Sequence, residues 1–135
     1  MTSGYSGTPL VKKLSLKDGM RAWWDGMPGS VRDEIGAEGL DLRLLTAPEA
    51  PIHAAHIFVT ERAELEAKMK QLLALLDRAG MIWVSWPKKA SKVPTDITED
   101  VIRDLALPMH LVDVKVCSVD DIWSGLKLVI RKEQR

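Results

Sequence analysis

Residues 54–86 have the sequence AAHIFVTERAELEAKMKQLLALLDRAGMIWVSW. Ala54–Thr60 is a predicted strand because it leads directly into a capped helix, and Met81–Trp86 is a second predicted strand because it is a short apolar run. Thr60 is expected to cap the helix between them, and Gly80 is expected to end it in a left-handed conformation. The apolar stripe of this helix consists of Leu65, Met69, Leu72, Leu73 and Leu76. This order of elements predicts two parallel strands joined by a right-handed crossover.

Two further strands are predicted upstream. Met20–Trp24 is an apolar run bounded by turn residues on both sides, so we expect a strand that is buried on both faces. Because side chains alternate along a strand, Trp23 and Trp24 should face opposite sides of the sheet. Leu42–Leu45 is a weaker candidate for a strand.

Two capping sequences predict short helices. Thr8 is expected to cap a helix that runs to Leu14, with the following proline at its first position. Asp96 and Glu99 have the spacing of a capping box, which predicts a helix from there to Leu105.

The carboxyl-terminal segment predicts an antiparallel hairpin. Apolar residues occur at every second position in two runs, which is the period of a strand. These residues are Val112, Val114 and Val116 in the first run and Leu126, Leu128 and Ile130 in the second.

The predicted fold class is α/β, a three-layer Rossmann-like fold with a mostly parallel sheet. We expect the strand order 2-1-3-4-6-5, with strand 6 antiparallel and inserted between strands 4 and 5. Residues 46–53 must then pass strand 1 without a helix, and eight extended residues reach roughly 26 Å, which is sufficient. A single domain is expected over residues 1–135, with residues 1–18 as an N-terminal arm and short helix packed on it.

The charge balance and the amino-terminal sequence argue against some classes of function and location. The chain has 135 residues, and its nineteen basic and nineteen acidic side chains give a formal charge of zero, so nucleic-acid binding is not expected. The amino-terminal sequence has no apolar run typical of a signal or membrane span, and the single Cys117 has no partner for an internal disulfide. We therefore expect a cytoplasmic protein that does not bind membranes.

Four segments carry a resemblance to a known family: GYSGTPLVKKL, HIFVTERAELE, WVSWPKKASKVPTDITEDVIRDLALP and LVDVKVCSVDDIWSGLKLVIRK. They resemble a family of small bacterial proteins of unknown function described as methyltransferase-like. The predicted strand order from Gly19 onward is similar to the C-terminal two-thirds of class I S-adenosylmethionine-dependent methyltransferases. The resemblance implies a reduced form of that fold and carries no established reaction.

The methyltransferase resemblance implies a cofactor site at Asp25, Gly26 and Gly29 after strand 1 and at Thr46 after strand 2. Pro28 removes one N–H donor from this turn, and strand 2 ends without the carboxylate that would bind ribose hydroxyls. The strand and helix that complete the cofactor half are also missing from the predicted elements. We therefore expect no cofactor, with S-adenosylmethionine as the alternative.

The loop after Trp86 is the first candidate ligand site, because ligands in open α/β sheets bind beyond the carboxyl ends of the strands. Its basic and hydroxyl side chains suit an anionic group, although an ordinary basic surface loop has the same composition. The candidate ligand-binding residues here are Trp86, Lys88, Lys89, Ser91 and Lys92.

A second candidate anion site is the segment around Ser6 and Thr8, where backbone N–H groups precede a helix. Helix capping by Thr8 is the alternative interpretation. His53 and His56 would diverge along a strand, so a shared metal ion is not expected. No catalytic residue is proposed, because Cys117 and His110 have no neighbouring partner in the sequence.

Three functions remain open from the sequence. The first is a non-catalytic methyltransferase-like domain that binds a small anionic ligand or a protein partner. The second is an S-adenosylmethionine-dependent methyltransferase. The third is a structural or homo-oligomeric module with an exposed apolar patch on the edge of the terminal hairpin.

Overall fold

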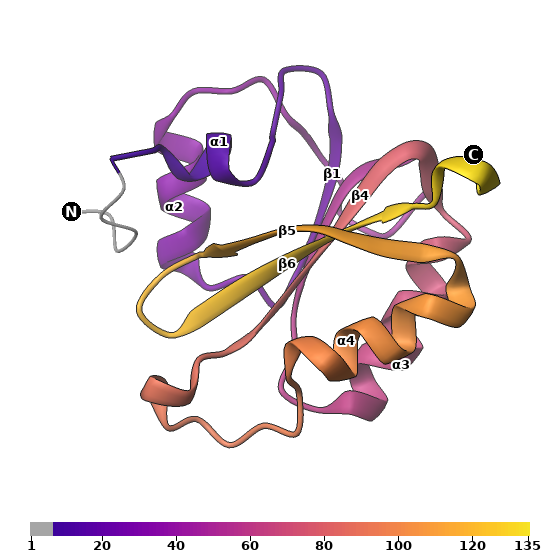
Figure 1. The fold of residues 1–135 in the computed structure, drawn as a ribbon. Coiled ribbons are helices and arrows are strands. Elements are labelled where there is room, and N and C mark those ends of the chain that lie inside the picture. Colours follow the sequence, from indigo (N-terminus) through magenta and orange to yellow (C-terminus); the bar gives the residue numbers. More distant parts are fainter. Residues whose placement is uncertain (1–6) are drawn as a thin grey trace.

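The computed structural model describes residues 7–135, which form a sheet with helices on both faces (Figure 1). The strands are β1 (Arg21–Asp25), β2 (Arg43–Leu44), β3 (Ile52–Phe58), β4 (Leu76–Pro87), β5 (Leu111–Ser118) and β6 (Trp123–Ile130). The helices are α1 (Leu10–Lys13), α2 (Gly29–Ala37), α3 (Arg62–Leu73) and α4 (Glu99–Ala106). Short 3₁₀ turns lie at η1 (Lys89–Ser91), η2 (Leu107–Met109) and η3 (Lys132–Gln134). Among the described helices, none is long and apolar enough to cross a membrane.

The strand order is β2-β1-β3-β4-β6-β5, which confirms the predicted topology. Strands β1 to β4 are parallel to one another, and β6 lies antiparallel between β4 and β5. The link from β2 to β3 passes β1 without a helix, as predicted. The carboxyl ends of β1 to β4 therefore meet at one edge of the sheet.

Two apolar cores lie on the two faces of the sheet. Helices α1 and α2 cover one face, and α3 and α4 cover the other (Figure 1). Trp24 is buried under α1 and α2, whereas Trp23 packs against the core under α3 and α4. The predicted opposite orientation of the two tryptophans is confirmed, and it follows from the alternation of side chains along β1.

Helix α3 has different ends from those predicted. Glu61, not Thr60, occupies its N-cap position, and the Arg62 N–H donates to Asp96 Oδ1 at 2.7 Å. The helix ends at Leu73, and the C-cap prediction for Gly80 is wrong because Gly80 lies inside β4. A Cβ at residue 80 would lie 2.8 Å from the Ile52 carbonyl oxygen, so glycine allows close packing of β4 on β3 here.

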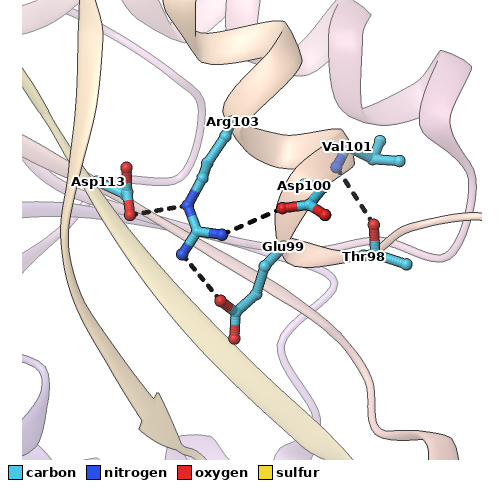
Figure 2. Close-up of polar contacts among 6 residues, drawn as sticks. All are labelled: Thr98, Glu99, Asp100, Val101, Arg103 and Asp113. Atoms are coloured by element: carbon cyan, nitrogen blue, oxygen red, sulfur yellow. Dashed lines mark hydrogen bonds and ion pairs between the residues drawn. The ribbon is translucent and has the colours of Figure 1, made fainter.

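The predicted caps of the other two helices are also displaced. Pro9 occupies the N-cap position of α1, so Thr8 lies one residue too early to be that cap. Thr98 caps α4 by accepting from the Val101 N–H at 3.2 Å, and the capping box at Asp96 is wrong (Figure 2). Asp96 is instead used by the first turn of α3.

Arg103 joins α4 to the edge strand β5 (Figure 2). Its guanidinium donates to Asp113 at 3.0 Å and to Glu99 at 2.8 Å, and it lies 3.4 Å from Asp100. Hydrogen bonds to Asp113 and Glu99 raise the pKa of Arg103 above its usual value. This contact holds the terminal hairpin against the α3 and α4 layer.

Candidate functional site

A hollow of about 490 Å³ opens beyond the carboxyl end of β4, between the following loop and the start of α4. Trp86 and Ile97 are buried and supply its apolar floor. Four of the five residues proposed for the loop after β4 line this hollow: Trp86, Lys88, Lys89 and Lys92. The structure therefore brings together residues that the sequence analysis selected from strand geometry alone.

The cations of this hollow differ in their contacts. Lys88 Nζ donates to Ser118 Oγ at 2.6 Å, so its amino group is already engaged by the terminal hairpin. Lys89 and Lys92 are exposed, and neither forms an ion pair within residues 7–135. Lys92 has φ +61°, a left-handed conformation that is uncommon for a lysine and turns the chain at this point.

Ser91 does not line the hollow and has a structural role. Its Oγ donates to the Lys88 carbonyl at 2.6 Å and accepts from the Val93 N–H at 3.2 Å. These bonds close the turn that contains η1. On the opposite wall, Glu99 is paired with Arg103, which reduces its repulsion of an anion.

A second hollow of about 400 Å³ lies at the carboxyl ends of β1 and β2. It includes Thr46, the residue proposed for the end of strand 2, and Arg32 from α2. The remaining lining residues are Trp23, Trp24, Leu44 and Leu45. No carboxylate lines this hollow, so it has no acidic acceptor for ribose hydroxyls.

The turn after β1 is held by contacts within the protein. Asp25 Oδ1 accepts from Lys68 Nζ at 2.9 Å, so an α3 cation neutralises the carboxylate proposed for the cofactor. Gly26 has φ +72°, and a Cβ there would lie 3.2 Å from the Phe58 carbonyl oxygen. Gly29 begins α2 with open space around it. Packing within the fold is therefore sufficient to require glycine at residue 26.

A buried His56–Ser85 pair lies on the central strands and was not predicted from the sequence. His56 Nε2 and Ser85 Oγ form a hydrogen bond of 2.6 Å, and both residues are fully buried. Burial lowers the pKa of His56 to about 3, so the imidazole is neutral at physiological pH. His56 Nδ1 has no hydrogen-bond partner among residues 7–135. The register pairs His56 with Trp83, so Ser85 lies two residues further along β4 on the same face of the sheet, and the one signal in the sequence was a single polar residue within each apolar run.

Aromatic rings enclose this pair. His56 stacks on Phe58 at 4.4 Å between ring centroids, and Trp24 and Trp83 lie 6.4 and 6.2 Å away. Trp123 contacts Phe58 edge-on at 5.1 Å and is half-buried, so part of its ring belongs to this aromatic cluster. The cluster forms core packing with a polar centre, and neither His56 nor Ser85 lines the two hollows described above.

The other candidates are not brought together. His53 Nδ1 accepts from the Arg21 N–H at 2.9 Å, and no group of three potential metal-ligating side chains occurs in the described part of the chain. Ser6 lies outside the described residues, and Thr8 is exposed before α1. Burial raises the pKa of the half-buried Cys117 thiol, which favours the unreactive form.

The sequence matches no protein-family model and no curated protein. Solved structures are similar in fold. OxaC in complex with SAH and oxaline matches at a TM-score of 0.61 and 13% identity, over 92% of this chain and 46% of that chain. Fibrillarin from Aeropyrum pernix, with bound S-adenosyl-L-methionine, matches at 0.54 and 12% identity, over 94% of this chain and 71% of that chain.

A third match is the precorrin-6y C5,15-methyltransferase from Geobacter metallireducens, at a TM-score of 0.55 and 12% identity over 90% of this chain and 85% of that chain. The chain has the class I methyltransferase fold. It spans less than half the length of OxaC. At these identities the similarity establishes the fold alone.

Proposed function

We propose that the protein is a non-catalytic methyltransferase-like domain that binds a small anionic ligand in the hollow beyond β4. The observation that carries the proposal is the combination of a Trp86 floor with the exposed, unpaired Lys89 and Lys92 at its rim. A ligand with an apolar body and an anionic group matches both parts of this surface. The only carboxylate in the lining, that of Glu99, is engaged by Arg103.

The chemistry of the site supports binding without catalysis. The hollow contains no histidine or cysteine, and Asp25 at the neighbouring turn is paired with Lys68. Among the described lining residues, the lysines and Glu99 are the groups that could act as a general acid or base, and Glu99 is held by Arg103. A protein partner that presents an acidic side chain to the same lysines is the second form of this proposal.

The test is calorimetric titration with phenyl phosphate, which has an aromatic body and one anionic group. Lys89→Gln combined with Lys92→Asn removes both charges, and asparagine tolerates the left-handed backbone at residue 92. We expect saturable binding that weakens at least about tenfold in this double variant. The matched control is Lys70→Gln combined with Lys132→Gln, which removes the same charge elsewhere. Equal affinity in both double variants would overturn the proposal.

S-adenosylmethionine-dependent methyl transfer is the second candidate, because similar structures hold S-adenosylmethionine or its product. Asp25, Gly26, Gly29 and Thr46 would surround that cofactor. These residues fit it poorly: Asp25 is engaged by Lys68, and Pro28 lacks an N–H at the start of α2. We therefore derive no catalytic step through the cofactor.

Titration with S-adenosylhomocysteine separates the two candidates without a known substrate. We expect no heat and no thermal stabilisation at millimolar concentration. Micromolar binding that Gly26→Val abolishes and that Lys89→Gln with Lys92→Asn leaves intact would establish the methyltransferase candidate instead. Circular dichroism of Gly26→Val must accompany the titration, because that substitution also strains the turn.

A further inference from the structure

Four lysine side chains lie on the α1 side of the terminal hairpin, two of them at Ser118 and two in contact with residues 13 and 15. Lys88 Nζ donates to Ser118 Oγ at 2.6 Å, and Lys13 Nζ lies 3.4 Å from the Ser118 carbonyl oxygen. Lys115 Nζ donates to the Lys13 carbonyl at 2.8 Å, and Lys127 Nζ donates to Ser15 Oγ at 3.2 Å. We call Lys13, Lys88, Lys115 and Lys127 the lysine cluster. Within residues 7–135, the hydrogen bonds of these amino groups go to neutral oxygens, namely hydroxyls and backbone carbonyls.

Two of these cations oppose each other directly. Lys115 on β5 pairs with Lys127 on β6 in the antiparallel register, and like charges in this arrangement destabilise a sheet. Lys127 is half-buried, and burial, followed by the charges of Lys115 and Lys17, lowers its pKa. The fold thus keeps a cation in an unfavourable environment.

The elements around the cluster provide no carboxylate that offsets it. Helix α1 and strand β6 contain no acidic residue. Asp113 of β5 is bound to Arg103 on the opposite face, and Asp120 Oδ1 accepts two backbone N–H groups of the hairpin turn. Asp18 Oδ1 accepts from the Asp41 N–H, and Asp121 is exposed in the turn.

The ion pairs of residues 7–135 include none of the four cluster lysines. Residues 1–6 contain no aspartate or glutamate either. Nothing in the chain that the structure describes, and no side chain in those six residues, neutralises the cluster by an ion pair.

We propose that the lysine cluster is a binding site for a small phosphorylated ligand, separate from the hollow beyond β4. Phosphate groups carry the negative charge that is missing around these amino groups, and their oxygens accept from lysine as well as from the hydroxyls of Ser15 and Ser118. Lysine ammonium groups suit a tetrahedral anion because they act as compact point charges. Lys88 also lines the hollow, but its amino group donates to Ser118 in the cluster.

Inorganic tripolyphosphate is the probe, titrated calorimetrically at constant ionic strength. Lys115→Gln combined with Lys127→Gln removes the opposed pair, and we expect affinity to fall at least about tenfold. Lys70→Gln with Lys132→Gln is the matched control and should bind within about twofold of the wild type. Lys89→Gln with Lys92→Asn removes the anion site proposed for the hollow, so the binding that remains in that variant reports the lysine cluster alone and keeps the two proposals distinguishable.

Stability of the variants supplies an independent measurement. Without the probe, Lys115→Gln with Lys127→Gln should unfold at or above the wild-type temperature, because a like-charge pair is removed. With tripolyphosphate, only the wild type and the control variants should gain further stability. Should the double variant fold poorly, Lys115→Gln alone keeps the test decisive, since Lys115 is exposed.

No saturable heat up to millimolar tripolyphosphate, or unchanged affinity in Lys115→Gln with Lys127→Gln, would overturn the proposal. If adenosine triphosphate and tripolyphosphate bind with equal affinity, the site recognises the phosphate groups alone. If the nucleotide binds more tightly, the site also contacts the nucleoside. If short duplex DNA binds through the same lysines and tripolyphosphate does not, the proposal of a small ligand is wrong and the cluster binds nucleic acid instead.

Discussion

His56 makes stability depend on pH. Its pKa is about 3 in the folded protein because of burial, against an ordinary value of 6.5. The unfolded chain therefore binds an extra proton between these values, so stability is complete above pH 6.5 and is lost as the pH falls toward 3. We expect a loss of about 1.4 kcal/mol per pH unit below pH 6 from this residue. Urea unfolding at several pH values measures it.

His56→Gln should flatten this dependence while lowering stability at neutral pH by about 1–3 kcal/mol, since the buried bond to Ser85 is disturbed. His110→Asn is the control, because His110 lies in a turn with φ +60° that asparagine accepts. A full wild-type slope in His56→Gln would show that other groups cause the acid sensitivity.

Gly26 and Gly29 lie three residues apart and should respond differently to alanine. Gly26→Ala places a Cβ at φ +72° and 3.2 Å from the Phe58 carbonyl oxygen, so a loss of about 1–2 kcal/mol is expected. Gly29→Ala meets no atom within 4 Å and reduces the freedom of the unfolded chain, so a gain of up to about 1 kcal/mol is expected. Chemical denaturation of the two variants compares them; equal losses would contradict a packing role specific to Gly26.

At the scale of elements, α3 depends on a cap from a distant loop. Asp96 accepts from the Arg62 N–H although the two residues are far apart in sequence. Asp96→Ala should therefore cost about 1 kcal/mol and speed hydrogen exchange at Arg62. Glu61→Ala should change stability little, because Glu61 occupies the N-cap position without a side-chain bond. A larger effect at Glu61 than at Asp96 would refute this assignment.

The Asp96–Arg62 contact illustrates why the strands could be predicted from the sequence and the ends of the helices could not. Strands such as β4 can be predicted because they are apolar runs. The strand order can be predicted because crossovers between parallel strands are right-handed. The ends of α3 could not be predicted from local sequence. The partner of the Arg62 N–H comes from a distant loop, and Gly80 allows the close approach of β4 to Ile52. Helix α2 gave little signal because it begins with glycine and buries only Val31 and Ile35.

At the scale of the molecule, the residues of the hollow beyond β4 could be predicted from local sequence, whereas the lysine cluster could not. Trp86 lies at the carboxyl end of β4, and Lys89 and Lys92 follow in the next loop, so the rule for strand ends was sufficient to group them. The lysine cluster combines α1, the loop after β4 and both strands of the hairpin. Its members come together through the β5–β6 register, the docking of α1 and the contact of Lys88 with Ser118, and a short stretch of sequence contains no sign of these contacts.

Two properties of the edge strand β5 have opposite effects on its pairing with a second copy of the chain. Val114 and Val116 are each 53% exposed there, which favours association. The register with β6 shifts between Asp113 and Lys115, however, so Asp113 contacts α4 while Lys115 contacts α1 on the opposite face. A regular strand would place these two side chains on one face, and a bulge of this kind interrupts the straight edge that a second strand needs.

We therefore expect a monomer of 15.0 kDa by light scattering. Val114→Thr with Val116→Thr should keep that mass and change stability by less than about 0.5 kcal/mol, because both side chains already contact water. Lys70→Gln with Lys132→Gln controls for nonspecific effects of surface substitution. A species of twice the mass that the threonine variant abolishes would contradict this prediction. It would show that valine contacts outweigh the interrupted register, and would favour the homo-oligomeric module as the role of the hairpin edge.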